Sequence, residues 1–176
     1  MTVFFTSDTH FGDPRVLRID RRPFASLKEH DEALIANWNA VVGPADEVWH
    51  LGDFALGKPD GQADALLDRL AGTKHLVIGN NDGPATVAST RWASVQHYAE
   101  MELDGVKLVM CHYPFRTWNR MGQGVLDLHG HSHGKLTPAP RQYDVGVDVH
   151  DFRPATLEEV RRRRRRAPAS LAPAPA

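Results

Sequence analysis

The chain has 176 residues, of which 41% are hydrophobic and 24% charged, and this suits a single domain with its own apolar core. No apolar run approaches the roughly 20 residues that a membrane-spanning helix needs. The amino-terminus has no cationic segment before its short apolar run, which argues against a signal peptide. The single cysteine excludes an intrachain disulfide and fits a reducing compartment. These features predict a cytoplasmic protein with no membrane partner.

The net charge of −1 hides a strong asymmetry along the chain. The run 161–166 consists of six arginines and the last ten residues are uncharged, so residues 1–160 together carry −7. Six adjacent arginines can bind nucleic acid, but no aromatic residues are interleaved, and a solvated helix end is the preferred interpretation. We therefore expect a folded domain over residues 1–160. The remainder, 161–176, is expected to be a helix end followed by a disordered Pro/Ala-rich tail.

In the first half of the chain, strand-like and helical patterns alternate. Ser26 and Glu29 form a capping box at the start of an amphipathic pattern, and Gly72 ends a second helical pattern. This order predicts parallel strands joined by helical crossovers. The expected strands are residues 2–7, 47–53 and 74–80, and the expected helices are residues 27–42 and 63–72.

The second half has a different pattern, with several short strands in succession. Asp104-Gly105 is a strong two-residue hairpin signal between two strand-like runs. A second capping box, from Thr156 to Glu159, opens a terminal helix that leads into the arginine run. We expect a second, more antiparallel sheet. Its strands are predicted at residues 95–103, 106–113, 125–130 and 143–149.

Polar side chains that can bind a metal follow five of these predicted strands. Taken singly, each has an ordinary explanation: a capping pair, a tight turn or a histidine of the core. Five such features at the ends of five successive strands are more specific, because loops at the carboxyl ends of strands converge on one sheet edge. Imidazole and oxygen ligands together suit Mn, Fe or Zn. The residues are Asp8, His10, Asp53, Asn80, His112, His131 and His133.

Over about residues 2–160, the order and spacing of these residues resemble the calcineurin-like metallophosphoesterases. The resemblance implies an α/β protein, a four-layer α/β/β/α sandwich of two mixed sheets flanked by helices. It also implies two divalent metal ions, with Mn²⁺ expected and Fe, Zn, Ni or Co as alternatives. One ion would be held by Asp8, His10, Asp53 and His133. The other would be held by Asp53 (as the bridging ligand), Asn80, His112 and His131.

The sequence departs from the family pattern at two places. Members most often have histidine at the position of Asn81, and that histidine is credited with protonating the leaving group or contacting the phosphate. Close relatives frequently have histidine at the position of Asp13 as well. An amide donates hydrogen bonds but has no proton to transfer near neutral pH. General acid catalysis is worth on the order of 10² to 10⁴ in rate, so we expect a narrower range of leaving groups rather than an inactive protein.

The resulting hypothesis is a dinuclear metal-dependent phosphoesterase, more specifically a phosphodiesterase, in which a metal-bridging hydroxide attacks phosphorus. The catalytic residues would be Asp53, His112 and Asn81, with Asn81 and Arg116 contacting the substrate. The substrate would be a small phosphate ester, with nucleotides and cyclic nucleotides as candidates. One alternative is a phosphomonoesterase acting on nucleotides or proteins. The other is a metal-binding scaffold without catalysis, although the complete ligand set argues against it.

The remaining polar residues near these motifs receive structural interpretations. His50 is expected to orient a ligand, and His129 to lie in the core or behind a ligand. For Asp82, bracing of its loop and capping of a turn are equally good explanations. The other histidines carry no special pattern and are expected at the surface: His30, His75, His97 and His150.

Overall fold

The computed structural model describes residues 1–56, 62–137 and 139–163. Arg164–Arg166 and the predicted disordered tail 167–176 therefore lie outside the described residues. The elements in chain order are β1 (Val3–Thr6), α1 (Arg15–Arg18), α2 (Leu27–Val41), β2 (Glu47–His50), α3 (Gln62–Leu67), β3 (Thr73–Val77), α4 (Pro84–Val87), β4 (Ser94–Gln96), β5 (Tyr98–Leu103), β6 (Val106–Cys111), the 3-10 turn η1 (Met121–Gln123), β7 (Leu126–His129), β8 (Gln142–Asp144), β9 (Ala155–Thr156) and α5 (Leu157–Arg163).

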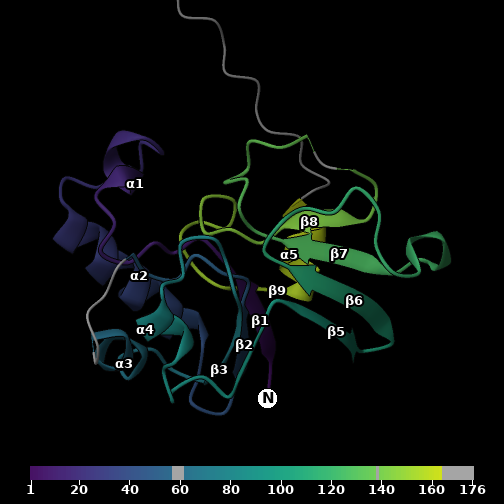
Figure 1. Cartoon of the computed structure of the whole chain (residues 1–176), viewed down its shortest axis with the longest axis horizontal. Coiled ribbons are helices and arrows are strands. Elements are labelled where there is room, and N and C mark those ends of the chain that lie inside the picture. The colour runs from purple at the N-terminus through teal and green to yellow at the C-terminus, as the bar shows by residue number, and fades with distance from the viewer. Residues whose placement is uncertain (57–61, 138, 164–176) are drawn as a thin grey trace, which may run out of the picture.

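Two mixed β-sheets form the centre of the molecule, as Figure 1 shows. The first has the order β4-β3-β2-β1-β9, in which the first four strands are parallel and β9 is antiparallel to β1. The second has the order β5-β6-β7-β8, with β5 antiparallel to β6 and the other pairs parallel. Helices α2, α3 and α4 lie on the outer side of the first sheet. The prediction of two mixed sheets with flanking helices is confirmed. The expectation that the second sheet is the more antiparallel one holds only for the β5–β6 hairpin, because β6, β7 and β8 run parallel.

An apolar cluster lies on each face of the first sheet, and its interior strand β1 is buried along its whole length. Phe4 of β1 faces the helical layer, whereas Phe5 beside it faces the second sheet, because successive side chains of a strand point to opposite faces. On the helical side the cluster includes Leu34, Trp38, Val48 and Leu76. Between the sheets it includes Val77, Leu108, Met110, Leu128 and, from α5, Leu157 and Val160.

The outer face of the second sheet is covered by the segment 113–125, which contains η1. Trp118 packs there against Val109 and Val125, and its indole N–H donates to the Val125 carbonyl over 2.9 Å. On this side the covering layer is thus a loop with a single 3-10 turn. Helix α5 instead contributes to the cluster between the two sheets.

The capping and hairpin predictions hold at the level of hydrogen bonds. Ser26 Oγ accepts from Glu29 N over 3.1 Å at the start of α2, while the Glu29 carboxylate accepts from Ala25 N. At α5, Thr156 N donates to the Glu159 carboxylate and Glu159 N to Thr156 Oγ1. Asp104 and Gly105 both have positive φ, at 50° and 75°, as a tight turn between β5 and β6 requires.

Three predicted boundaries differ from the structure. The run 95–103 is two strands, because the chain leaves the first sheet after β4 and enters the second at β5, with His97 between them. Helix α3 ends at Leu67, before Gly72, which has a φ of 84°. In the run 143–149 only the first two residues belong to a strand. No helix in the described ranges has both the length and the apolar character that crossing a membrane demands.

Candidate metal centre

All seven predicted ligands come together at the carboxyl ends of the strands. The loop after β1 provides Asp8 and His10, and the loops after β2 and β3 provide Asp53 and Asn80. From the second sheet, the residue after β6 and the loop after β7 provide the remaining imidazoles, His112, His131 and His133. The centre therefore lies where the two sheets meet.

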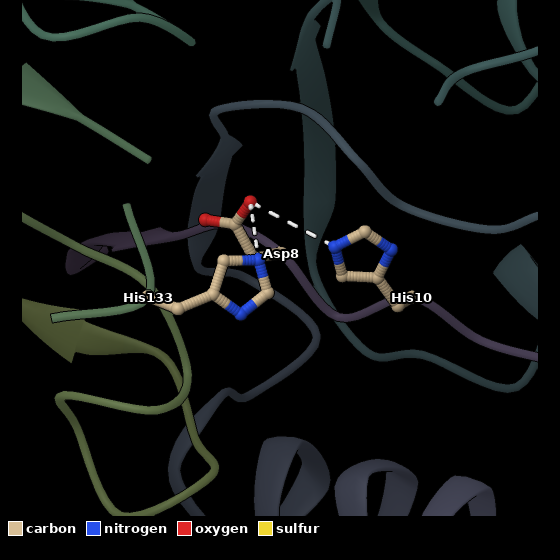
Figure 2. Close-up of side chains that lie close together, drawn as sticks. All are labelled: Asp8, His10 and His133. Atoms are coloured by element: carbon tan, nitrogen blue, oxygen red, sulfur yellow. Dashed lines mark ion pairs between the residues drawn. The ribbon is translucent and has the colours of Figure 1, made fainter. Parts of the chain in front are cut away.

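The donor atoms form two groups, and within each group they lie within 4.8 Å of one another. The first consists of Asp8, His10 and His133. Figure 2 shows one oxygen of Asp8 facing a nitrogen of each ring: Oδ1 lies 4.0 Å from His10 Nε2 and 3.7 Å from His133 Nε2. The second consists of Asp53, His112 and His131.

Asp53 joins the two groups. Its Oδ2 lies 3.6 Å from His10 Nε2, and its Oδ1 lies 3.6 Å from His112 Nε2. Asn80 completes the second group, because its Oδ1 lies 3.0 Å from His112 Nε2. A single carboxylate thus faces both groups, one oxygen to each.

The backbone at the centre is held in an uncommon conformation. Five of the seven residues have a left-handed φ, between 48° and 67°. Such conformations cost free energy in non-glycine residues and occur preferentially at functional sites. The five residues are Asp8, His10, Asp53, His131 and His133.

Two glycines allow the carboxylates to pack closely against the backbone. A Cβ added to Gly79 would lie 2.3 Å from Asp53 Oδ1, and one added to Gly130 would lie 2.6 Å from Asp8 Oδ2. Both distances are far below a van der Waals contact. These positions therefore require glycine if the two carboxylates are to keep their places.

A cation would stabilise the buried donor atoms of the first group. Burial raises the pKa of Asp8 to about 8, despite the nearby His133. Burial also lowers the pKa of His10 to about 4, so its imidazole is neutral near pH 7, and both its ring nitrogens are buried without a hydrogen-bond partner among the described residues. A buried carboxylate beside a neutral imidazole suits a bound metal ion.

The hydrogen bonds of His112 support the same conclusion for the second group. Its Nδ1 lies 2.8 Å from the Leu51 carbonyl oxygen, which can only accept, so Nδ1 carries the proton. This leaves the lone pair of Nε2 facing the oxygens of Asn80 and Asp53. Three acceptors that face one another fit a cation between them. The residues present therefore fit two metal ions.

A network that the sequence patterns did not reveal lies behind the first group. Asp148 Oδ2 lies 2.9 Å from His133 Nδ1, and the same carboxylate accepts two hydrogen bonds from the buried Arg22. Arg22 also donates to the carbonyls of Asp8 and Thr9. Burial alone would raise the pKa of Asp148, but the bonds from His133 and Arg22 hold that pKa far below its usual value.

Asp82 braces the loop of the second group. Its carboxylate accepts from Asp53 N and Phe54 N across the neighbouring loop, at 2.9 and 2.8 Å, and from Gly79 N at 2.8 Å. The first two bonds show bracing between loops. The third is a local turn contact, so both sequence-based explanations describe part of what Asp82 does.

Asn81 lies next to Asp53 and holds its carboxylate. Its backbone N donates to Asp53 Oδ1 and its side-chain Nδ2 to Asp53 Oδ2, both over 2.7 Å. Its Oδ1 accepts from Arg15 Nη2 over 3.0 Å. Arg116, the arginine that the sequence indicated, is exposed and has no hydrogen bond or ion pair to the described residues. Substrate contacts by Asn81 and Arg116 stay predictions.

The remaining histidines divide between the core and the surface. His50 is buried and shares a 2.9 Å hydrogen bond with Thr9 Oγ1, between the candidate ligands of the first loop, while the His129 ring bonds the Gly130 carbonyl. The expectation that His30 and His150 lie at the surface was wrong. His30 lies on the face of α2 that Leu34 and Trp38 occupy, and its ring nitrogens pair with Arg22 and Asp31.

The other three histidines without a pattern differ in their exposure. His150 is buried, and its Nε2 is hydrogen-bonded to the Asp144 carbonyl over 3.0 Å. His75 is half-buried, since its ring stacks on Trp49 with 4.5 Å between centroids. His97 is exposed, as expected.

Two mixed sheets with two candidate metal-binding groups at their common edge, linked by one carboxylate, indicate a metallophosphoesterase-type protein. Comparison with known families supports this class, because the model of the calcineurin-like phosphoesterase superfamily domain matches residues 1–144. The chain belongs to this superfamily, whose members are metal-dependent phosphoester hydrolases.

Relatives of similar length occur in a phage and an archaeon. The Gene 66 protein of Mycobacterium phage D29 is 34% identical, with 90% of this chain and 94% of that protein covered. An uncharacterized protein of Methanocaldococcus jannaschii is 29% identical, with 89% and 87% covered. Among solved structures, a protein of unknown function from Aquifex aeolicus superposes with a TM-score of 0.70 at 22% identity, covering 91% of this chain and 97% of its own. At this level of sequence identity, the similarity shows a shared fold.

Proposed function

We propose that this protein is a dinuclear metal-dependent phosphodiesterase. The observation that carries the proposal is the arrangement of two donor groups on either side of Asp53, one carboxylate oxygen to each. Asp8, His10, Asp53 and His133 would hold one ion, and Asp53, Asn80, His112 and His131 the other. The mixture of carboxylate, amide and imidazole donors suits Mn²⁺ as well as Fe or Zn.

Bound divalent ions would supply Lewis-acid activation of water and of the phosphoryl group. The residues of the chain place and orient the reacting groups. Asn81 fixes both oxygens of Asp53, and the Leu51 carbonyl fixes the tautomer of His112. Arg22 and Asp148 fix the ring of His133. Such support behind the ligands sets the geometry in which the phosphate ester is held.

The expected range of leaving groups rests on Asn81. Its amide has no proton to give to a departing alkoxide near neutral pH. Leaving groups that depart as stable anions need such a proton least, so aryl diesters should be better substrates than alkyl diesters. Nucleotides and cyclic nucleotides are the natural phosphate esters that we would test first.

The test is Mn²⁺-dependent hydrolysis of bis(p-nitrophenyl) phosphate and p-nitrophenyl phosphate by the wild-type protein, together with metal analysis. We expect two ions per chain, and turnover of the diester that exceeds turnover of the monoester. One bound ion would contradict the dinuclear centre. Two ions without turnover of either ester would instead support the metal-binding scaffold.

Asp148→Asn should weaken binding at the first group without unfolding the protein. The substitution removes the carboxylate charge that orients His133, and loss of such a supporting group typically costs 10- to 100-fold in metal affinity. Titration with Mn²⁺, followed calorimetrically, measures the change. Glu47→Gln is the matched control, because Glu47 pairs with His75 over 3.2 Å outside the centre. Equal Mn²⁺ affinity in Asp148→Asn and wild type would show that Asp148 does not orient the ligand.

A further inference from the structure

Arg15, the first residue of α1, is attached to the metal centre by a continuous set of hydrogen bonds. Its Nη2 donates to Asn81 Oδ1 over 3.0 Å, and Asn81 in turn donates to both oxygens of Asp53. No sequence pattern had singled out this arginine. Through Asn81, the cationic side chain of Arg15 is connected to Asp53, the carboxylate that faces both ligand groups.

The guanidinium group is held rigidly on one edge. Arg15 Nε donates to both oxygens of Asp13 over 2.9 Å, and Nη2 donates to Asp13 Oδ2 over 2.7 Å. Asp13 is itself buried, with 2% of its side chain exposed, and its Oδ2 lies 3.5 Å from His10 Nδ1. The orientation of Arg15 is therefore fixed from two sides, by Asp13 and by Asn81.

The opposite edge of the guanidinium is free. Within the described residues, Arg15 Nη1 has no hydrogen-bond or ion-pair partner, and 42% of the Arg15 side chain is exposed. A planar guanidinium that is already oriented loses little conformational entropy when it binds an anion. The two N–H groups of Nη1, on a guanidinium that contacts Asn81, are thus available to a ligand with anionic oxygens.

We propose that Arg15 binds an anionic oxygen of the phosphate ester, with Asp13 and Asn81 as the residues that position it. The inference rests on the proposed function and adds to it the residue that recognises substrate charge. A guanidinium remains charged at every pH at which the protein is folded, so it recognises charge and transfers no proton. A dianionic phosphate should depend on Arg15 more than a monoanionic diester does.

The experiment measures calorimetrically the binding of inorganic phosphate to the Mn²⁺-loaded protein. Arg15→Ala should bind phosphate about 10-fold more weakly or worse, since a hydrogen bond to a charged group is worth roughly 1.5–3 kcal/mol. Arg15→Lys should recover part of the loss, and guanidinium ion added to Arg15→Ala should recover part as well. Arg69→Ala is the matched control, because Arg69 is 48% exposed and forms a two-point pair with Glu32 away from the centre.

The same samples separate recognition from a merely structural role. If Arg15 only held the Asp13 loop in place, its loss would lower the Mn²⁺ content, whereas our proposal predicts unchanged Mn²⁺ content and weaker phosphate binding. For hydrolysis, Arg15→Ala should raise KM more than it lowers kcat, and more for p-nitrophenyl phosphate than for the diester. Unchanged phosphate affinity in Arg15→Ala overturns the proposal even if the wild type hydrolyses neither ester.

Discussion

Asp53→Asn should deplete both metal sites and lower phosphodiester turnover by about 10³-fold or more. Metal catalysis contributes several kcal/mol of transition-state stabilisation, and each 1.36 kcal/mol corresponds to a factor of ten. The two oxygens of Asp53 lie 3.6 Å from nitrogens of different ligand groups. An asparagine offers one neutral oxygen and one NH₂ group in their place, so it removes negative charge from both groups at once.

Metal analysis of the purified variant is the direct measurement, and thermal unfolding gives an independent one. An ion that binds only the folded protein raises its stability with increasing free metal concentration. Added Mn²⁺ should therefore raise the Tm of the wild type but leave Asp53→Asn nearly unchanged. Asp127→Asn is the control, since Asp127 is a buried carboxylate of β7 outside the centre. Two tightly held ions in Asp53→Asn would refute the bridging role.

The meeting of the candidate ligands was predictable because each one stands at or shortly after the carboxyl end of a strand. A parallel sheet brings the carboxyl ends of its strands to one edge, so Asp8, Asp53 and Asn80 are placed together by topology alone. The same argument applies to His112, because the predicted Asp104-Gly105 hairpin places it at the end of the second hairpin strand. The division of these residues between two ions came instead from the resemblance to the family.

The supporting residues were not predictable in this way. Arg22 and Asp148 are 126 positions apart, and each stands in a segment without periodicity. Arg15 reaches Asn81 across 66 positions. Only the packed tertiary structure brings such pairs together, because no local backbone preference encodes them. The face of α2 is a different case, since His30, Leu34 and Trp38 recur at four-residue intervals and the burial of His30 could have been inferred from that spacing.

The fold prediction failed where local and tertiary preferences compete. The run 95–103 alternates like one strand, yet β4 pairs with β3 and β5 with β6. Strand character is a local property, whereas the sheet that a strand joins depends on its neighbours. His97 therefore lies at a change of sheet that the alternation cannot indicate.

Asn81→His should raise the hydrolysis of alkyl diesters by up to about 10²-fold and change aryl diesters little. An imidazole at this position restores a proton donor, and general acid catalysis is worth on the order of 10² to 10⁴. Aryl leaving groups depart as stable anions and gain little from it. The substitution also replaces the amide that donates to Asp53 and accepts from Arg15, so the Mn²⁺ content of the variant must be verified first.

The decisive quantity is the ratio of alkyl to aryl diester rates in the wild type, in Asn81→His and in Asn81→Ala. Alanine removes the same side-chain hydrogen bonds without adding a donor, so it separates loss of the Asp53 and Arg15 contacts from gain of an acid. A ratio that rises in the histidine variant alone places position 81 beside the leaving group. If both variants keep the wild-type ratio with two ions bound, Asn81 serves only to hold Asp53 and Arg15, and the leaving group departs on another side of the centre.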